Sequence, residues 1–173
     1  KTAYQESGVS LVRSTNVFDY AFSYDDLAHI SDKQADQLSN VVVEENDVLF
    51  NITGVSVTRC CIVPADVLPA RVNQHVMILR PKTAMPMSYY IMTTLCSAEN
   101  KAKPMGIAQS GSTREAINKQ EMESFSIPVP PTKEVQDFEI KARGLYESVI
   151  RNTEEIMRLN VMQQLLLSQL SSR

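Results

Sequence analysis

The chain has 173 residues, of which 43% are hydrophobic and 21% charged, and its formal net charge is −3. This length suits one globular domain with a hydrophobic core and one further long helix. No apolar run approaches the roughly 20 residues that span a bilayer, and no charged-then-apolar leader is present, so we expect a cytoplasmic protein with no membrane segment. The sequence begins at Lys1 rather than at Met, as expected of a fragment whose natural start is missing.

Charge is segregated along the chain. Residues 1–56 carry three basic and nine acidic side chains, whereas residues 57–131 carry eight basic and five acidic ones. Phosphate contacts need local rather than net positive charge, so a polyanion would meet the middle of the chain. For any single Lys or Arg in this block, a solvated surface position is the simpler interpretation.

The sequence shows no motif typical of a catalytic or metal-binding site. Cys60, Cys61 and Cys96 form an odd set, and adjacent cysteines inside an apolar run are typical of small buried hydrophobic residues. His29 and His75 are the only histidines, and they are not spaced as metal ligands. No phosphate loop, paired-carboxylate signature or nucleophile motif occurs. We therefore predict no catalytic site, no metal site and no cofactor held by this chain.

Short elements alternate over the first 131 residues. Strands are predicted at residues 9–13, 27–30, 47–51, 59–63, 76–80 and 125–129. Helices are predicted at 31–38, with Ser31 as N-cap, at 88–97 and onward to about 107, and at 119–124. This mixture predicts an α+β fold, in which a strand-rich, partly barrel-like domain over residues 1–131 carries flanking helices.

Residues 132–173 follow a heptad pattern that predicts a long C-terminal coiled-coil helix. It starts after Pro130-Pro131 with Thr132 as N-cap, and it would be about 60 Å long. Nine of eleven seam positions from Val135 onward are apolar, including Phe138, Leu145, Val149, Ile156, Leu159, Leu166 and Leu170. Asn152 and Gln163 are the polar exceptions. The alternative is an ordinary terminal helix folded onto its own domain and interrupted at Gly144.

Five short motifs occur in a specific order before this helix. They are Gly8–Arg13, Asp47–Gly54, Val72–Val76, Gly111–Thr113 and Ile127–Pro131. This succession resembles the target recognition domain and the following conserved helix of the specificity subunit of type I restriction-modification systems. The resemblance covers nearly the whole chain, and it is the order of the motifs, rather than any one of them, that is specific.

The resemblance implies a non-catalytic subunit that reads one half of a split double-stranded DNA target. It also implies docking of methyltransferase (modification) subunits, which bind S-adenosylmethionine, and a restriction subunit reached through the complex. Full-length members carry two recognition domains joined by an antiparallel coiled coil, and this chain carries one. It is thus an excised half or a natural half-length subunit, and the seam predicts a two-fold homodimer through the C-terminal helix in both cases.

Residue type suggests which side chains contact DNA. Lys, Arg, Ser and Thr hold phosphates, whereas Arg, Asn and Gln pair with base edges. The predicted backbone contacts are Lys101, Lys103, Ser112, Thr113 and Arg114, with a solvated turn as the alternative for the loop 109–114 and base reading as a second possible role of Arg114. The predicted base contacts are Arg13, Ser14, Thr15, Asn16, Thr58 and Arg59. Gln74 and His75 suit a turn as well as a base, and an assembly module without DNA binding is the alternative function.

Overall fold

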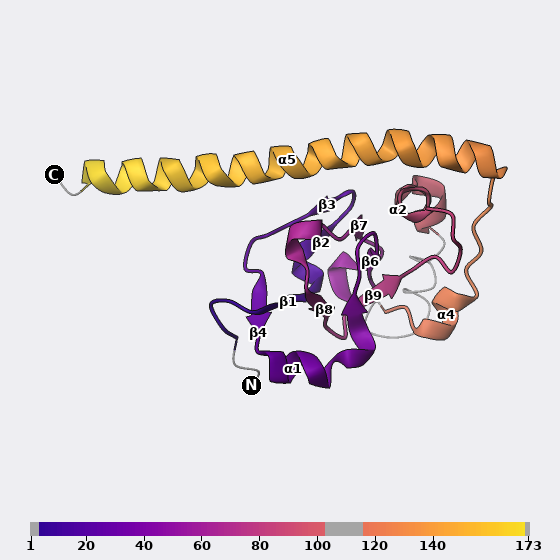
Figure 1. The fold of residues 1–173 in the computed structure, drawn as a ribbon, viewed down its shortest axis with the longest axis horizontal. Helices are drawn as coiled ribbons and strands as arrows, with labels where there is room; N and C mark the ends of the chain where they lie inside the picture. The colour runs from indigo at the N-terminus through magenta and orange to yellow at the C-terminus, as the bar shows by residue number, and fades with distance from the viewer. Residues whose placement is uncertain (1–3, 103–115, 172–173) are drawn as a thin grey trace.

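The computed structural model describes residues 4–102 and 116–171. Short strands and helices form a domain, and a single long helix lies across it and continues past its edge (Figure 1). This confirms the predicted α+β fold with a long C-terminal helix. The strands of the described residues form two sheets and one hairpin, and none of these closes into a barrel.

The first sheet gathers strands that are far apart in the sequence. Its order is β4-β1-β8-β5, with β1 antiparallel to β4 and parallel to β8, and β8 antiparallel to β5. The bounds are Val9–Val12 (β1), Ala28–Ile30 (β4), Val42–Val43 (β5) and Ala70–Val72 (β8). Between β4 and β5 lies α1 (Asp32–Gln37), which begins at the predicted N-cap Ser31 with a capping box to Gln34.

The second sheet is antiparallel and is centred on β6, in the order β7-β6-β9. Side chains of a strand alternate between two faces, and all four residues of β6 are buried because both faces are covered. Leu49 packs in one core cluster, and Val48 and Phe50 pack in another. The bounds are Val48–Asn51 (β6), Cys60–Ile62 (β7) and Val76–Leu79 (β9), with Val17–Phe18 (β2) and Ala21–Phe22 (β3) as the hairpin beside β7.

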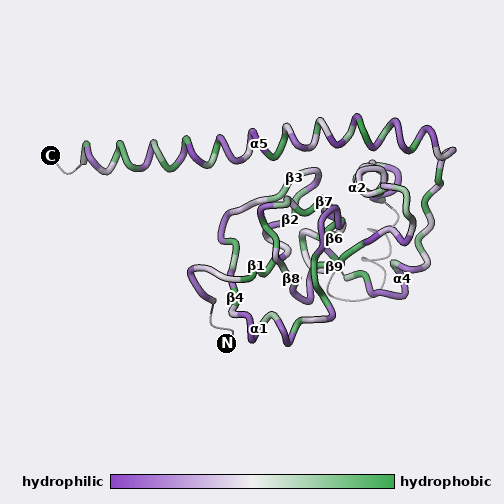
Figure 2. Tube along the Cα trace, in the orientation of Figure 1, coloured by the Kyte–Doolittle hydropathy of each residue, from purple (hydrophilic) through white to green (hydrophobic). Residues whose placement is uncertain are grey.

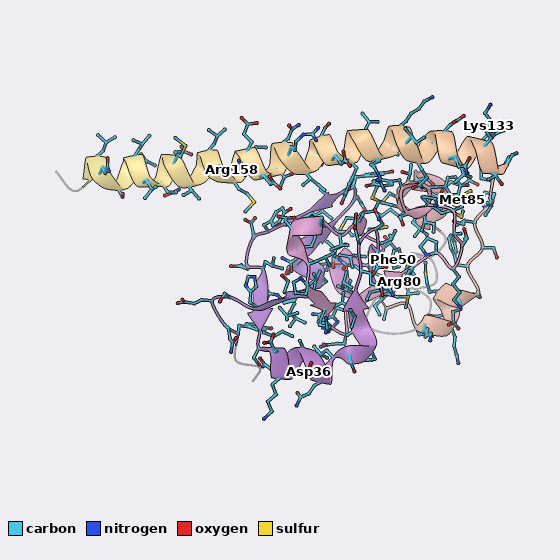
Figure 3. All side chains as sticks on the ribbon, viewed as in Figure 1. Asp36, Phe50, Arg80, Met85, Lys133 and Arg158 are labelled. Carbon is cyan, nitrogen blue, oxygen red and sulfur yellow. The ribbon has the colours of Figure 1, made fainter. Side chains whose placement is uncertain are left out.

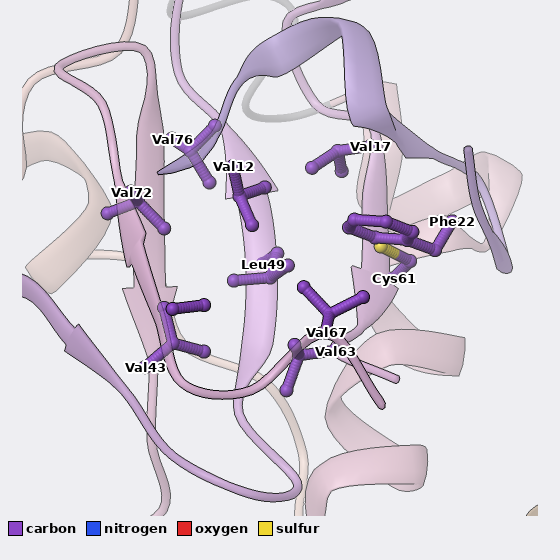
Figure 4. Packing of buried hydrophobic residues seen from close by; sticks show 11 residues of the cluster. Val12, Val17, Phe22, Val43, Leu49, Cys61, Val63, Val67, Val72 and Val76 are labelled. Carbon is purple, nitrogen blue, oxygen red and sulfur yellow. The ribbon is translucent and has the colours of Figure 1, made fainter. Parts of the chain in front are cut away.

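Two hydrophobic clusters fill the space on either side of β6. In the first, Val12, Leu49 and Val72 approach one another from strands of the two sheets (Figure 4). The second lies between the sheet and the helices α2 (Ser88–Cys96) and α5 (Thr132–Ser171). The sheet is therefore held from both sides, and the loops at its ends have fixed positions.

The cysteines follow the same alternation along β7. Cys61 packs in the first cluster and Cys60 in the second, and both thiols are free and fully buried. This confirms their predicted role as small buried hydrophobic residues. Burial raises the pKa of both thiols, which keeps them neutral and unreactive.

The segment that leads into α5 corrects one prediction. Residues 125–129, predicted as a strand, form neither strand nor helix. Pro128, Pro130 and Pro131 explain the difference, since proline has no N–H to donate to a sheet. The structure confirms the helices predicted before this segment, with α2, a helical stretch that includes residues 98–102, and α4 (Lys119–Glu123). The predicted continuation over residues 103–107 lies outside the described residues.

α5 is one continuous helix of 40 residues, about 60 Å long, so Gly144 does not interrupt it. Its first half packs on the domain, where Val135, Glu139 and Tyr146 are buried. Every side chain from residue 161 to residue 170 is exposed, and the C-terminal end of α5 extends past the domain (Figure 3). Among the described helices, none is apolar over a long enough stretch to cross a membrane.

This docking divides the predicted seam. Phe138 packs against the domain, which corrects its expected place in a seam open to a partner. A heptad stripe recurs every 3.5 residues and a straight α-helix has 3.6 residues per turn, so the stripe drifts off the domain-facing side by about 20° per heptad. Hydrophobic residues recur along α5 as far as its free end (Figure 2). The exposed seam residues are Leu145, Val149, Ile156, Leu159, Leu166 and Leu170.

Two polar contacts fix α5 on the domain. The Tyr146 hydroxyl donates to the Ile62 carbonyl at 2.6 Å and accepts from the Ile62 N–H at 3.1 Å, along the edge strand β7. The Glu139 carboxylate accepts from the Tyr90 N–H at 2.7 Å, in the first turn of α2. Burial raises the pKa of the Glu139 carboxyl. Each contact satisfies backbone groups that a strand edge or a helix start leaves unpaired.

Replacing Tyr146 by Phe keeps the ring but leaves the Ile62 N–H and carbonyl without their partner. We expect the free energy of unfolding, measured by urea titration, to fall by about 1–3 kcal/mol. Tyr90→Phe is the matched control, because its hydroxyl donates to the Pro128 carbonyl at the surface, and we expect a loss of about 0.5 kcal/mol. Equal losses in the two variants would contradict an anchoring role for the Tyr146 hydroxyl.

Candidate nucleic-acid interface

Three chain segments meet at one end of the second sheet: the turn after β1, the turn between β6 and β7, and the residues that lead into β9. The antiparallel register places Asn51 opposite Val76, so the end of β6 lies beside the start of β9. The Asn51 side chain donates to the Ser14 carbonyl at 2.9 Å and joins the first turn to the same end. Loops fixed on a rigid scaffold in this way are common carriers of function.

The three segments surround a hollow of about 500 Å³. The residues that line it, which we call the rim, are Ser14, Thr15, Phe18, Thr53, Gly54, Val55, Ser56, Arg59 and His75. Four of the predicted DNA contacts, Ser14, Thr15, Arg59 and His75, belong to the rim. Residues up to about 60 positions apart in the sequence thus share one surface.

The turn between β6 and β7 is held by its own backbone. Within the 3-10 turn Gly54–Ser56, the Val57 N–H donates to the Gly54 carbonyl at 2.9 Å. Gly54 and Thr58 have positive φ angles of 72° and 73°, a conformation that is unfavourable for Thr. The Thr58 N–H donates back to the Asn51 carbonyl at 2.8 Å. The turn therefore keeps one shape at the mouth of the hollow.

Two of the predicted contacts are buried. The Asn16 side chain accepts from the Arg13 N–H at 3.0 Å, and it donates to the carbonyls of Ser23 and Asp25 at 3.0 and 3.1 Å. Thr58 is also fully buried, and its hydroxyl has no hydrogen-bond partner among the described residues. A side chain without exposed surface does not reach a duplex, so the structure removes Asn16 and Thr58 from the predicted contacts.

Aromatic rings and a carboxylate hold the cations at this end of the domain. The Arg59 guanidinium lies over the Phe18 ring, 4.7 Å from its centroid. Arg13 lies over the Tyr4 ring at 5.7 Å and donates to the Asp26 carbonyl. Lys101 forms an ion pair with Asp19, the residue after Phe18. Lys101 is therefore held beside the rim, although it comes from the helical stretch that follows α2.

Gln74 and His75 differ in how they are held, and the structure supports the turn role for His75. His75 is anchored, because its Nδ1 shares a hydrogen bond of 2.7 Å with Thr53 Oγ1 and its N–H donates to Asn73 Oδ1 at 3.0 Å. Gln74 is exposed, and its Nε2 lies 3.3 Å from His75 Nε2. His75 thus ties down the turn, and Gln74 presents an amide beside the rim.

Four predicted contacts, Lys103, Ser112, Thr113 and Arg114, lie outside the described residues. The described chain resumes at Ala116, which pairs with Thr53 of the rim in an isolated bridge. The structure adds Phe18 and Val55 to the rim, and residue type alone does not point to either of them. Phe18 belongs to a strand of two residues, which carries no periodic signal in the sequence.

The rim presents hydroxyl, imidazole and guanidinium groups, and the Gln74 amide lies beside it. These are groups that contact phosphates and base edges. Tyr20 lies outside the rim, and burial raises its pKa, with the neighbouring Cys96 and Asp19 adding to this effect. Within residues 4–102 and 116–171, no group of three or more His, Cys, Asp or Glu side chains is placed to hold a metal ion.

The fold and the rim indicate a domain that recognises nucleic acid. The type I restriction modification DNA specificity domain family matches residues 10–142 of the sequence. Because this match covers more than half of the chain, the chain belongs to that family, whose role is DNA sequence recognition in restriction-modification systems. No curated protein is significantly similar to the chain in sequence.

The fold is shared with a solved structure described as the structural basis of complex assembly and conformational transition of the type I R-M system. The alignment covers 91% of this chain with a TM-score of 0.54 and 17% sequence identity. It covers 37% of the other chain, so this chain spans little more than a third of that length. At this identity the similarity establishes the fold alone.

Asn16→Ala tests the structural role of the buried amide. We expect the free energy of unfolding to fall by about 2–3 kcal/mol, because three hydrogen bonds are lost and their backbone partners stay buried. Thr15→Ala, at the neighbouring exposed position, is expected to change it by about 0.5 kcal/mol or less. Chemical denaturation measures both. An Asn16→Ala variant as stable as the unmodified chain would return Asn16 to the list of candidate DNA contacts.

Proposed function

We propose that this chain reads one half of a split double-stranded DNA target, as a recognition domain of a type I specificity subunit. The rim carries this proposal, because Ser14, Thr15 and Arg59 come from distant segments and present hydroxyl and guanidinium groups around one hollow. Family membership supports DNA sequence recognition in general. The positively charged middle block supplies cations, as binding by counterion release requires.

The proposed contacts divide into base readers and phosphate contacts. Arg59 and Gln74 suit base edges, because a guanidinium pairs with guanine and an amide pairs with adenine. Ser14, Thr15 and Lys101 suit phosphate oxygens, which fix the register on DNA without carrying sequence information. Lys101 forms an ion pair with the Asp19 carboxylate, so it must leave that carboxylate when it binds a DNA phosphate.

Six further residues complete the proposed interface. Arg13 adds a guanidinium on the turn that also carries Ser14, and His75 adds an imidazole beside Gln74. The other four rest on the sequence alone: Lys103, Ser112, Thr113 and Arg114.

We also propose that the chain works without catalysis of its own. Methyltransferase (modification) subunits that bind S-adenosylmethionine would supply methyl transfer, and a restriction subunit reached through the complex would supply cleavage. A family defined by DNA specificity supports this division of labour. The purified chain with S-adenosylmethionine is expected to methylate no DNA until a modification subunit is added, and methylation by the chain alone would refute this.

The exposed part of α5 supports a two-fold homodimer. Leu145 is 73% exposed and Leu170 is 70% exposed, and an apolar stripe of this length is stabilised by a second helix. Consecutive helix residues point about 100° apart, so Leu145 faces solvent while Tyr146 faces the domain. A partner helix therefore binds without displacing the domain.

The seam defines one register for an antiparallel pair. With the two-fold axis between Met157 and Arg158, Leu145 lies opposite the partner's Leu170. The two polar seam residues, Asn152 and the partner's Gln163, then face each other. Polar pairing at one level of an apolar seam fixes the register, because a shifted helix would bury each amide against hydrophobic side chains.

Arg59→Ala is expected to weaken binding to a duplex selected from a random pool by about 1–3 kcal/mol and to weaken binding to random DNA much less. Lys101→Ala is expected to weaken both equally and to lower the salt slope of binding by about one. Anisotropy titrations at several salt concentrations measure these effects.

Arg158→Ala is the matched control for both variants. It removes the same charge from an exposed position on α5, where the Arg158 side chain is 78% exposed, and it is expected to leave DNA binding unchanged. If neither rim variant differs from this control, the DNA surface lies elsewhere. If the unmodified chain retains no DNA, the second candidate function, assembly through the exposed leucines of α5, is the better account.

Leu159→Asp is expected to convert the homodimer into a monomer, because a carboxylate in an apolar seam is desolvated without a partner. Gln164→Glu adds the same charge to the helix outside the seam and is expected to leave the dimer intact. Analytical ultracentrifugation measures both. A stable monomer for the unmodified chain would refute the dimer. The double variant Asn152→Cys with Gln163→Cys should cross-link on oxidation, whereas cross-linking by Asn152→Cys alone would indicate a parallel pair.

A further inference from the structure

Val55 projects from the rim with 98% of its surface exposed. Outside α5, the next most exposed large hydrophobic side chain of the described residues is Val129, at 58%. The exposed apolar residues of α5 belong to one long helix on which they recur, whereas Val55 lies at the tip of a short turn. Single exposed apolar residues are common on protein surfaces, so the meaning of Val55 depends on how it is held and what surrounds it.

The turn holds Val55 outward in one position. The Val57 N–H closes the 3-10 turn onto the Gly54 carbonyl, and the Arg59 N–H donates to the Ser56 carbonyl at 3.1 Å. Val57 is 2% exposed and therefore fastens the turn to the core. A branched side chain on such a base loses little freedom when it meets a ligand, which favours binding.

Polar groups and one aromatic ring share the hollow with this apolar tip. Thr53, Ser56, Arg59 and His75 supply the polar groups, and Phe18, which is 41% exposed, supplies the ring. A protein partner that matched Val55 alone would gain little buried area, because protein interfaces have an apolar core larger than one side chain. A base pair in the major groove presents a different mixture, since a thymine places its C5-methyl group beside polar edge atoms.

We infer that Val55 contacts the C5-methyl group of a thymine in the major groove and so selects thymine at one position of the half-site. This inference rests on the proposed function, and it adds an apolar reader to the polar contacts given above. Apolar side chains of other DNA-binding proteins read thymine in this way. Side chains that wedge between base pairs are mostly longer or bulkier, such as Phe, Leu and Met, so a valine at the tip of a turn suits the methyl contact better.

The test removes the methyl group without changing any hydrogen-bonding atom. The full chain first selects a preferred duplex from a random pool, and each thymine of that duplex is then replaced in turn by deoxyuridine. At one position, replacement of thymine by deoxyuridine is expected to lower the affinity of the unmodified chain about fourfold. This corresponds to the ~0.8 kcal/mol that burial of one methyl group contributes. Val55→Ala is expected to lose at least as much on the thymine duplex and to be insensitive to that same replacement.

Val129→Ala is the matched control, because it truncates the same side chain at another exposed site, and it is expected to keep the full response to deoxyuridine. Urea unfolding of Val55→Ala should match that of the unmodified chain, since Val55 buries no surface. Equal affinity of the unmodified chain for every deoxyuridine duplex would overturn the inference, as would a Val55→Ala loss that is the same with and without the methyl group. Failure to select any sequence would instead overturn the proposed function on which the inference rests.

Discussion

Burial of β6 on both faces determines where the other segments lie. Leu49 faces the core between the sheets, and Val48 and Phe50 face the helices, so neither side of the strand is free. A slip by one residue would exchange these faces, and the register is therefore fixed. A fixed register also fixes the turn that follows Asn51 and the adjoining start of β9. Packing of hydrophobic side chains in the core therefore determines where the polar side chains of the rim lie.

α5 combines two periodicities that diverge along its length. Val135 and Tyr146 keep to the face that a straight helix turns toward the domain, whereas the heptad stripe rotates away and leaves Leu159 in solvent. The interpretation as a coiled-coil rod and the interpretation as a terminal helix on its own domain each describe one half of the same element. The contacts of Tyr146 and Glu139 with backbone groups set the direction in which the free half points.

Sequence patterns predict what local chemistry determines and miss what tertiary contact determines. The N-cap at Ser31 and the apolar runs of β6 and β7 are local, and the structure confirms them. Strands of two residues, such as Val42–Val43, are too short for an alternating pattern. Asn16 is a polar residue in a predicted loop, where an exposed side chain is expected. Only the fold shows that its amide donates hydrogen bonds to the carbonyls of Ser23 and Asp25. The hydrogen bond from the Asn51 side chain to the Ser14 carbonyl joins two segments of the rim. Its partners are 37 positions apart in the sequence, so no local spacing pattern predicts it.

The hollow inside the rim is lined by no residue of α5, and this has an evolutionary consequence. Val55 is 98% exposed, so its side chain supports neither the core nor α5, and the fold tolerates substitution there. Under the proposed function, a lineage is able to acquire a new recognition sequence through a few surface changes, while α5 and its contacts with the domain are inherited intact. Selection for novelty and selection for assembly act on different residues of the same chain, and neither obstructs the other.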